Sequence, residues 1–110
     1  MIKEALLGGN AYRLFVGELQ RYLDFARPMF AESTLPSADA ARLLAANFHT
    51  IKGSAGFFGF DDIFRSAGEL EKTLMGIEKG ASPDWLALQA TFSVLVNAAS
   101  LIPPPKEASV

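Results

Sequence analysis

The sequence predicts an all-α protein that folds as an antiparallel, up-down four-helix bundle. Apolar residues recur at spacings of three and four in four separate stretches, which is the period of an amphipathic helix. No stretch of useful length alternates apolar and polar residues as a half-buried strand requires. Residues typical of caps and loops separate the four stretches by short connections, which favours antiparallel neighbours.

The first helix is predicted over residues 10–31. Pro28 lies in its last turns, where a proline lacks a backbone donor and clashes with the preceding turn, so we expect a kink or fraying there. Residues 33–36, Ser-Thr-Leu-Pro, are expected to form a loop. The predicted core stripe consists of Phe15, Leu19, Tyr22, Leu23, Ala26 and Phe30.

The second helix is predicted to begin near Ser37, whose hydroxyl suits an N-cap, with Asp39 in the first turn. Gly59 is expected to end it. The predicted core face consists of Leu44, Phe48, Ile51, Ala55 and Phe58.

The third helix is predicted over residues 61–78, followed by Lys79-Gly80 as its C-terminal cap. Its stripe is predicted to consist of Phe64, Ala67, Leu70, Leu74 and Ile77.

The fourth helix is predicted to open with Ser82 as the N-cap, Pro83 at the first helical position and Asp84 in the first turn. Three prolines at 103–105 cannot continue a helix. We therefore expect a bundle domain over residues 1–102 and a proline-rich tail or linker over 103–110. The predicted inward residues are Leu88, Phe92, Leu95, Val96 and Ala99.

Composition excludes several classes of protein. The 110 residues suit one small domain, and a formal charge of -2 without a basic stripe argues against a nucleic-acid partner. The absence of cysteine excludes disulfides and thiolate metal sites and fits the cytoplasm. Residues 1–9 do not resemble a signal peptide, and no apolar run approaches the roughly 20 residues that span a membrane. We expect a cytoplasmic monomer.

The single histidine, His49, lies in an unusual setting. A lysine follows it by three positions, and glycines follow by four and by seven. At about 100° per residue, His49, Lys52, Gly53 and Gly56 share one arc beside the core stripe, so the imidazole should be reachable from solvent. Interior glycines cost a helix roughly 0.5 to 1 kcal/mol each, and close approach by another surface would account for them.

This combination favours a nucleophilic histidine. Imidazole is available as a nucleophile near neutral pH, and it acts best when an acceptor holds one ring nitrogen and leaves the other outward. Glu69 and Glu71 of the third helix are both candidate acceptors, and Lys52 could balance the charge of a phosphoryl group. Taken singly, each residue has an ordinary explanation, as a surface histidine, a solvated lysine or a glycine for helix packing.

The run His49 to Gly56, followed by Phe58-Gly59-Phe60, resembles the phosphoacceptor motif of histidine-containing phosphotransfer (HPt) domains. It is most similar to the phosphotransfer domain of chemotaxis histidine kinases, and the helical layout extends the resemblance over nearly the whole chain.

The resemblance implies a role for each residue of the motif. His49 would be phosphorylated on its outward ring nitrogen, Lys52 would assist near the phosphate, and Glu71 would hold the other ring nitrogen. Some members of the family have a further polar residue, often histidine, three positions before that glutamate. This chain has Gly68 there, which is a departure.

The resemblance also implies a function. The chain would be a phosphoryl carrier without its own ATP site, accepting the group from a histidine kinase or a receiver domain and passing it to a receiver aspartate. Mg²⁺ would be bound by the receiver, and no cofactor or metal is expected in this chain. The expected partner-binding residues are Ala45, Gly53, Gly56, Phe57 and Gly68.

The sequence alone leaves two alternatives. Phe57 could be exposed at a partner interface or could cap the end of the bundle. A helical interaction or dimerisation module without phosphotransfer is the alternative function. A metal- or haem-binding bundle is disfavoured because such sites need several inward ligands and the chain has one histidine.

Overall fold

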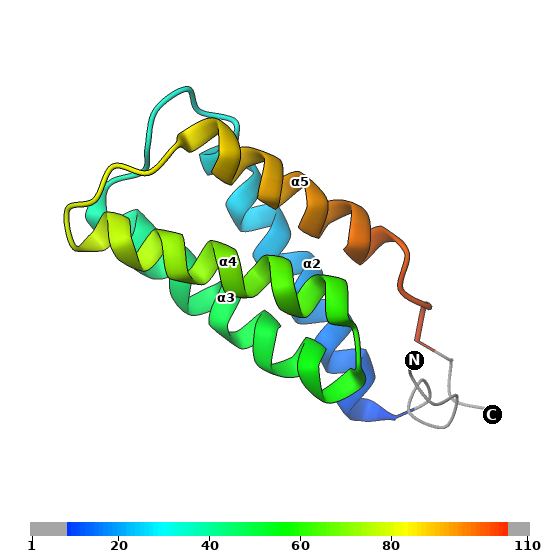
Figure 1. Ribbon diagram of the computed structural model, residues 1–110. Coiled ribbons are helices and arrows are strands. Elements are labelled where there is room, and N and C mark those ends of the chain that lie inside the picture. The colour runs from blue at the N-terminus through cyan, green and yellow to red at the C-terminus, as the bar shows by residue number, and fades with distance from the viewer. Residues whose placement is uncertain (1–8, 106–110) are drawn as a thin grey trace.

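The computed structural model describes residues 9–105 and shows four helices in the predicted arrangement (Figure 1). They are α2 (Asn10–Phe30), α3 (Ala38–Phe58), α4 (Asp61–Glu78) and α5 (Trp85–Ser100). Successive helices run in opposite directions, and residues 9–105 contain no strand. The predicted all-α, up-down bundle is confirmed.

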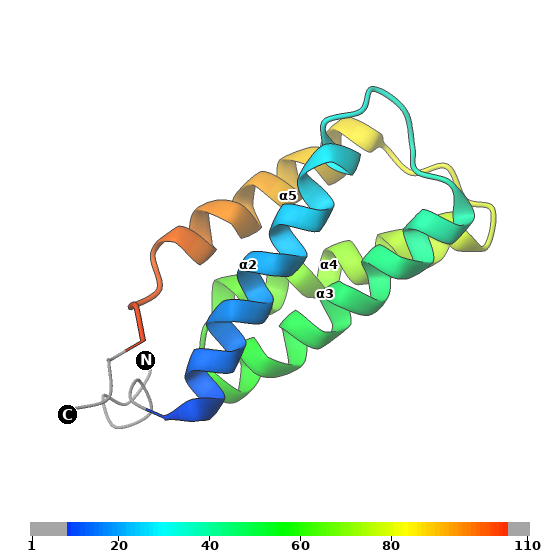
Figure 2. The same ribbon diagram turned by 180° about the vertical axis from the view of Figure 1, so that it is seen from behind.

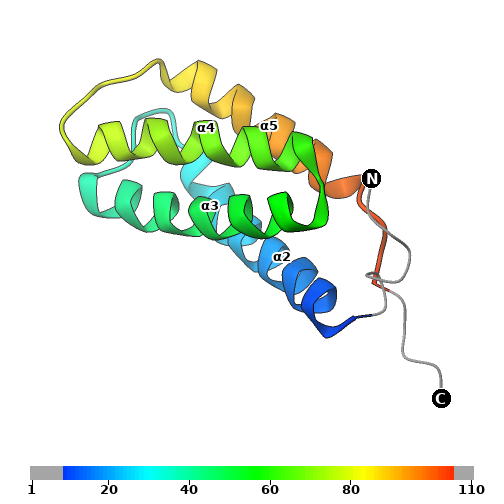
Figure 3. The same ribbon diagram turned by 60° about the horizontal axis from the view of Figure 1, so that its bottom comes forward.

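The helices α3 and α4 form the most extensive pair in the bundle and lie side by side along most of their length (Figure 3). The helix α2 packs on α3, and α5 packs on α4 and more lightly on α2 (Figure 2). The outer faces of α3 and α4 therefore form one continuous side of the molecule.

The core is built from the predicted stripes with one displacement. Ile63 is buried whereas Phe64 is exposed, so the inward face of α4 begins one residue earlier than predicted. The prediction chose the wrong member of an adjacent apolar pair, because both residues are apolar and only packing decides between them. Tyr22 and Val96 are partly buried rather than fully buried, and Tyr12 is a core residue that the pattern did not identify.

The ends of α3 follow the predicted chemistry. The Ser37 hydroxyl accepts a hydrogen bond from the Ala40 amide at 3.2 Å, which satisfies a free donor of the first turn. Gly59 has a φ of 82°, the left-handed conformation that a residue without Cβ adopts readily. The Phe60 amide then donates to the Ala55 carbonyl at 2.9 Å and closes the helix.

The start of α5 differs from the prediction. The helix begins at Trp85, and Asp84 rather than Ser82 is the N-cap, since its carboxylate accepts from the Ala87 amide at 3.3 Å. Trp85 fixes this position, because its ring stacks on Phe30 at 5.2 Å and its indole N–H donates to the Glu32 carbonyl at 2.9 Å. Tertiary anchoring, which the local sequence does not contain, sets the boundary.

The helix α2 continues past Pro28 and ends at Phe30. At the other end of α2, the buried Tyr12 hydroxyl donates a hydrogen bond to the Pro103 carbonyl, which connects the segment after α5 to α2. Within residues 9–105, no helix combines the length and apolar character that crossing a membrane requires. The expectations for residues 1–8 and for the tail beyond 105 lie outside the described residues.

Candidate functional site

The antiparallel packing of α3 and α4 places the His49 imidazole against the Glu71 carboxylate. The distance from His49 Nδ1 to Glu71 Oε2 is 2.8 Å. A carboxylate only accepts hydrogen bonds, so Nδ1 is the donor, and in the neutral imidazole Nε2 then has its lone pair free. The His49 side chain is 73% exposed and that of Glu71 only 17%. The free nitrogen therefore belongs to a ring that solvent and other molecules can reach, while its partner is held within the surface.

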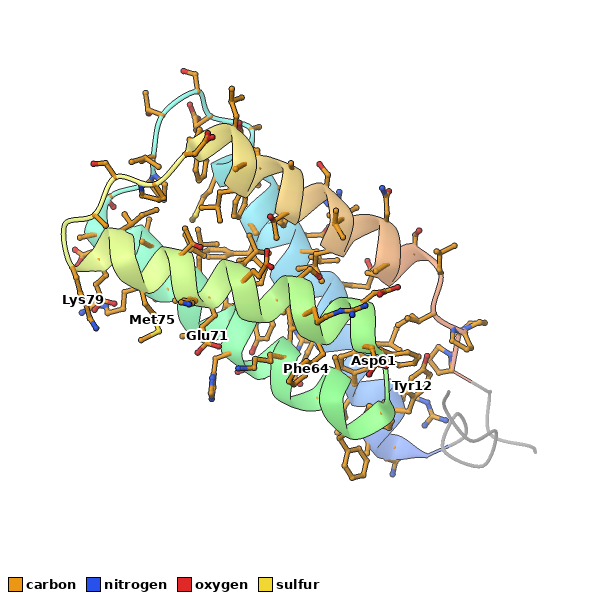
Figure 4. The ribbon with its side chains drawn as sticks, in the orientation of Figure 1. Tyr12, Asp61, Phe64, Glu71, Met75 and Lys79 are labelled. Carbon is orange, nitrogen blue, oxygen red and sulfur yellow. The ribbon has the colours of Figure 1, made fainter. Side chains whose placement is uncertain are left out.

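Lys52 completes the charged cluster. Its Nζ atom lies 3.9 Å from Glu71 Oε1, so the two carboxylate oxygens face different partners. The same ammonium lies 5.5 Å from the centre of the Phe64 ring, within the range of a cation–π contact. Glu71, not Glu69, is thus the acidic residue between His49 and Lys52, and it points from α4 toward α3 (Figure 4).

Two glycines make room for these side chains. A Cβ built on Gly68 would lie 3.4 Å from Lys52 Cδ, so the lysine stem lies directly over this glycine. A Cβ on Gly56 would lie 3.1 Å from the Phe64 ring, closer than ordinary contact. Both glycines are therefore covered by side chains of this chain itself.

The structure separates the five residues expected to bind a partner. Gly53 has no atom within 4 Å of the position that a Cβ would occupy, and Phe57 is 71% exposed, so Phe57 does not cap the bundle. Ala45 is buried, with 5% of its surface exposed, because it belongs to the inward face of α3. The expectation that Ala45 offers surface to a partner is therefore wrong, while Gly53 and Phe57 are the open positions.

A shallow groove of about 600 Å³ extends along α4 next to the charged cluster. Gly68 and Gly76 are among its lining residues, and the exposed Phe64 and Met75 contribute apolar surface (Figure 4). This groove could not be predicted from the apolar pattern, which places Phe64 in the core, whereas its ring is exposed. The signal was a second apolar residue, Met75, outside the predicted stripe. The charged residues of the lining are Lys52, Arg65, Lys72, Lys79, Glu69 and Glu71.

Over residues 9–105, no group of three or more His, Cys, Asp or Glu side chains is placed to hold a metal ion. The cluster around His49 instead combines one imidazole, one carboxylate and one ammonium. Such a set can orient a nucleophilic nitrogen and balance charge on a group bound to it.

Comparison with known proteins gives one family. The model of the Hpt domain family matches residues 11–101, which include all four helices apart from the first residue of α2. No curated protein and no solved structure gives a significant match to the chain. Because the match covers most of the sequence and the fold agrees with it, the chain belongs to the Hpt domain family, whose members carry phosphoryl groups in phosphorelays and work with response-regulator receivers.

Proposed function

We propose that His49 is the phosphoacceptor of this domain and that Nε2 is the nitrogen that is phosphorylated. The observation that supports this most directly is the 2.8 Å hydrogen bond between His49 Nδ1 and Glu71 on a ring that is otherwise exposed. This bond fixes the tautomer, so the neutral ring offers a lone pair at Nε2 without first losing a proton.

The proposed transfer forms one bond at Nε2 and breaks one bond in the donor. The Nε2 lone pair attacks the phosphorus of a phosphoryl donor, the N–P bond forms, and the bond from phosphorus to the leaving oxygen breaks. The leaving group departs as ADP or as a receiver carboxylate, and the proton on Nδ1 stays in its bond to Glu71. The positive charge that develops on the ring faces the Glu71 carboxylate, and Lys52 supplies a cation within one helical turn for the phosphoryl oxygens.

The proposed donor is a histidine kinase catalytic domain or a phosphorylated receiver, and the proposed acceptor is the aspartate of a receiver. A receiver binds Mg²⁺ through its own acidic cluster, so no metal is required in this chain. The groove beside His49 supports such a partner electrostatically, because its four basic side chains outnumber its two acidic ones.

The proposed docking surface covers His49 and the open positions beside it on α3. Gly53 offers bare backbone to an approaching surface, and Phe57 presents an exposed aromatic ring of the kind that often anchors an interface. Gly56 and Gly68 contribute indirectly, through the Phe64 and Lys52 side chains that cover them.

Phosphorylation of the parent chain and of His49→Gln tests the proposal. Each protein is incubated with phosphoramidate, a small phosphoryl donor, and separately with histidine kinases and ATP. We expect acid-labile, base-stable phosphate on the parent and none on the variant. The variant should unfold at nearly the same temperature as the parent, because His49 lies outside the core.

The alternative function, an interaction module without phosphotransfer, predicts a different result. In that case a folded parent chain would take up no phosphate from either source, or His49→Gln would take up as much as the parent. Either result would remove His49 as the phosphoacceptor.

A further inference from the structure

The position of the Lys52 side chain is not explained by a role near the phosphate alone. The stem lies across Gly68, where a Cβ would be 3.4 Å from Cδ and 3.6 Å from Cε. The ammonium lies over the Phe64 ring and 3.9 Å from Glu71 Oε1. Phe64 and Gly68 together form a site that we call the lysine seat. It keeps the ammonium near Glu71 Oε1, while His49 contacts the other carboxylate oxygen, Oε2.

We propose that Phe64 and Gly68 are positioning residues that hold Lys52 in the unphosphorylated domain, and that Lys52 leaves the lysine seat for the phosphoryl group when His49 is phosphorylated. The second half of this inference rests on the proposed function of His49. The first half does not, because it concerns the resting protein.

Charge drives the movement in one direction. Before the reaction, Glu71 has a neutral imidazole on Oε2 and the Lys52 ammonium near Oε1. After the reaction the ring itself carries positive charge against Glu71, which weakens the attraction between Glu71 and Lys52. At the same time a phosphoryl group with close to two negative charges appears within one turn of Lys52 on the same helix. Both changes favour a movement of the Lys52 ammonium away from Phe64 and Glu71 of α4 and toward the phosphoryl group.

The contacts that hold Lys52 in the lysine seat are weak enough for its side chain to leave. The Lys52 side chain is 38% exposed, and a partly exposed ion pair at 3.9 Å contributes little to stability. The stem is flexible, so the ammonium can turn toward His49 without a change in the backbone. A larger residue at position 68 would fill the space that the stem occupies and would displace Lys52 even in the resting protein.

Nuclear Overhauser contacts test the lysine seat directly in the full chain. In the unphosphorylated protein we expect contacts from the Lys52 δ-methylene to the Gly68 α-protons and from the Lys52 ε-methylene to the Phe64 ring. Lys72 and Lys79 serve as internal controls without such ring contacts. After phosphorylation by phosphoramidate, the Lys52 contacts should disappear. Their absence in the resting protein would overturn the lysine seat, and their persistence in the phosphorylated protein would overturn the movement.

A double-mutant cycle tests the function of the lysine seat. Because resting contacts must be broken during the reaction, Gly68→Leu should speed phosphorylation by phosphoramidate, by about fivefold at most, since exposed ion pairs contribute about 1 kcal/mol or less. The same substitution in a Lys52→Met background should have no effect. Gly17→Leu, at a helical glycine of α2 where an added Cβ would meet only the Arg21 side chain at 3.6 Å, is the matched control and should change neither rate.

Each other outcome of the cycle contradicts the inference. An equal effect of Gly68→Leu with and without Lys52 would show that it acts independently of the lysine. An unchanged or slower rate in the Lys52 background would show that the lysine seat does not restrain the cation. If no donor phosphorylates the parent chain, the proposed function and the movement fail together, whereas the contacts in the resting protein still decide whether the lysine seat exists.

Discussion

At the scale of single residues, the site depends on which acidic side chain of α4 faces His49. Glu69 and Glu71 are two positions apart, which places them on different faces of one helix. The residue pattern alone left both as candidates, and the family resemblance pointed to Glu71. The choice depends on the register of α4 against α3, which is a property of packing and is not contained in the spacing within either helix.

We expect Glu71→Ala to slow phosphorylation by phosphoramidate about tenfold or more without abolishing it. The substitution removes a hydrogen bond to a charged group, for which losses of about 1.5 to 3 kcal/mol are typical. It also allows the proton of the neutral ring to lie on either nitrogen, so that Nε2 is no longer always the free one. Glu69→Ala is the control and should react at the parent rate, because Glu69 does not contact His49. Equal losses in both variants would argue against a specific role for the bond to Nδ1.

A second prediction at this scale concerns Gly53. Gly53→Leu should leave phosphorylation by phosphoramidate unchanged but reduce transfer to a receiver domain, because the new side chain projects into open space where the partner would dock. The variant should also be more stable, since replacing a helical glycine gains roughly 0.5 to 1 kcal/mol. Thermal unfolding and transfer kinetics on the same samples separate the two effects. Normal transfer to the receiver would remove Gly53 from the docking surface.

At the scale of the helices, the sequence predicted best where the chemistry is local. The two ends of α3 follow from a serine that caps and a glycine that adopts a left-handed conformation, and both lie where the sequence placed them. The predicted start of α5 was wrong because serine, proline and aspartate each suit a helix start, and the Trp85 contact with Phe30 decides among them. The α4 stripe was displaced at Phe64 for a similar reason, since that ring packs over Gly56 instead of entering the core.

The correction at α5 is itself testable. Asp84→Ala should lower the free energy of unfolding by about 1 kcal/mol, because the first turn loses the acceptor for the Ala87 amide. Ser82→Ala should have almost no effect, since Ser82 makes no capping bond in this structure. Urea denaturation of both variants measures the difference. A larger loss for Ser82→Ala would restore the helix start that the sequence suggested.

At the scale of the whole molecule, α2 and α5 pack against the inner faces of α3 and α4. Tyr12 joins the two ends of this support, because it is buried among Phe15, Phe58 and Phe60 and its hydroxyl donates to the Pro103 carbonyl. Burial raises the pKa of Tyr12 above its ordinary value of 10.0. Apolar periodicity could predict the bundle, but it could not assign this polar aromatic residue to the core.

The raised pKa gives a pH dependence of known sign. Above about pH 10 a tyrosine in the unfolded chain loses its proton, while folded Tyr12 keeps its proton to higher pH. The unfolded state then binds fewer protons than the folded state. The contribution of Tyr12 to the free energy of unfolding is therefore complete below about pH 10 and falls as the pH rises beyond it. Tyr12→Phe should lack this component. Subtracting its urea midpoints from those of the parent between pH 8 and 11 cancels the contribution of lysines, and a constant difference would contradict the assignment.

All the side chains of the charged cluster come from α3 and α4, and none of its contacts involves α2 or α5. In evolutionary terms, the part of the domain proposed to react is a single hairpin, and the other two helices need only preserve an apolar inner face and the few polar contacts that anchor them. Substitutions on the outside of α2 and α5 can therefore accumulate without touching the chemistry. If the groove contacts the receiver as proposed, changes at Lys72, Met75 or Lys79 would alter partner choice while His49 and Glu71 stay as they are. Two descendants of this domain could thus keep the same reaction and serve different pathways.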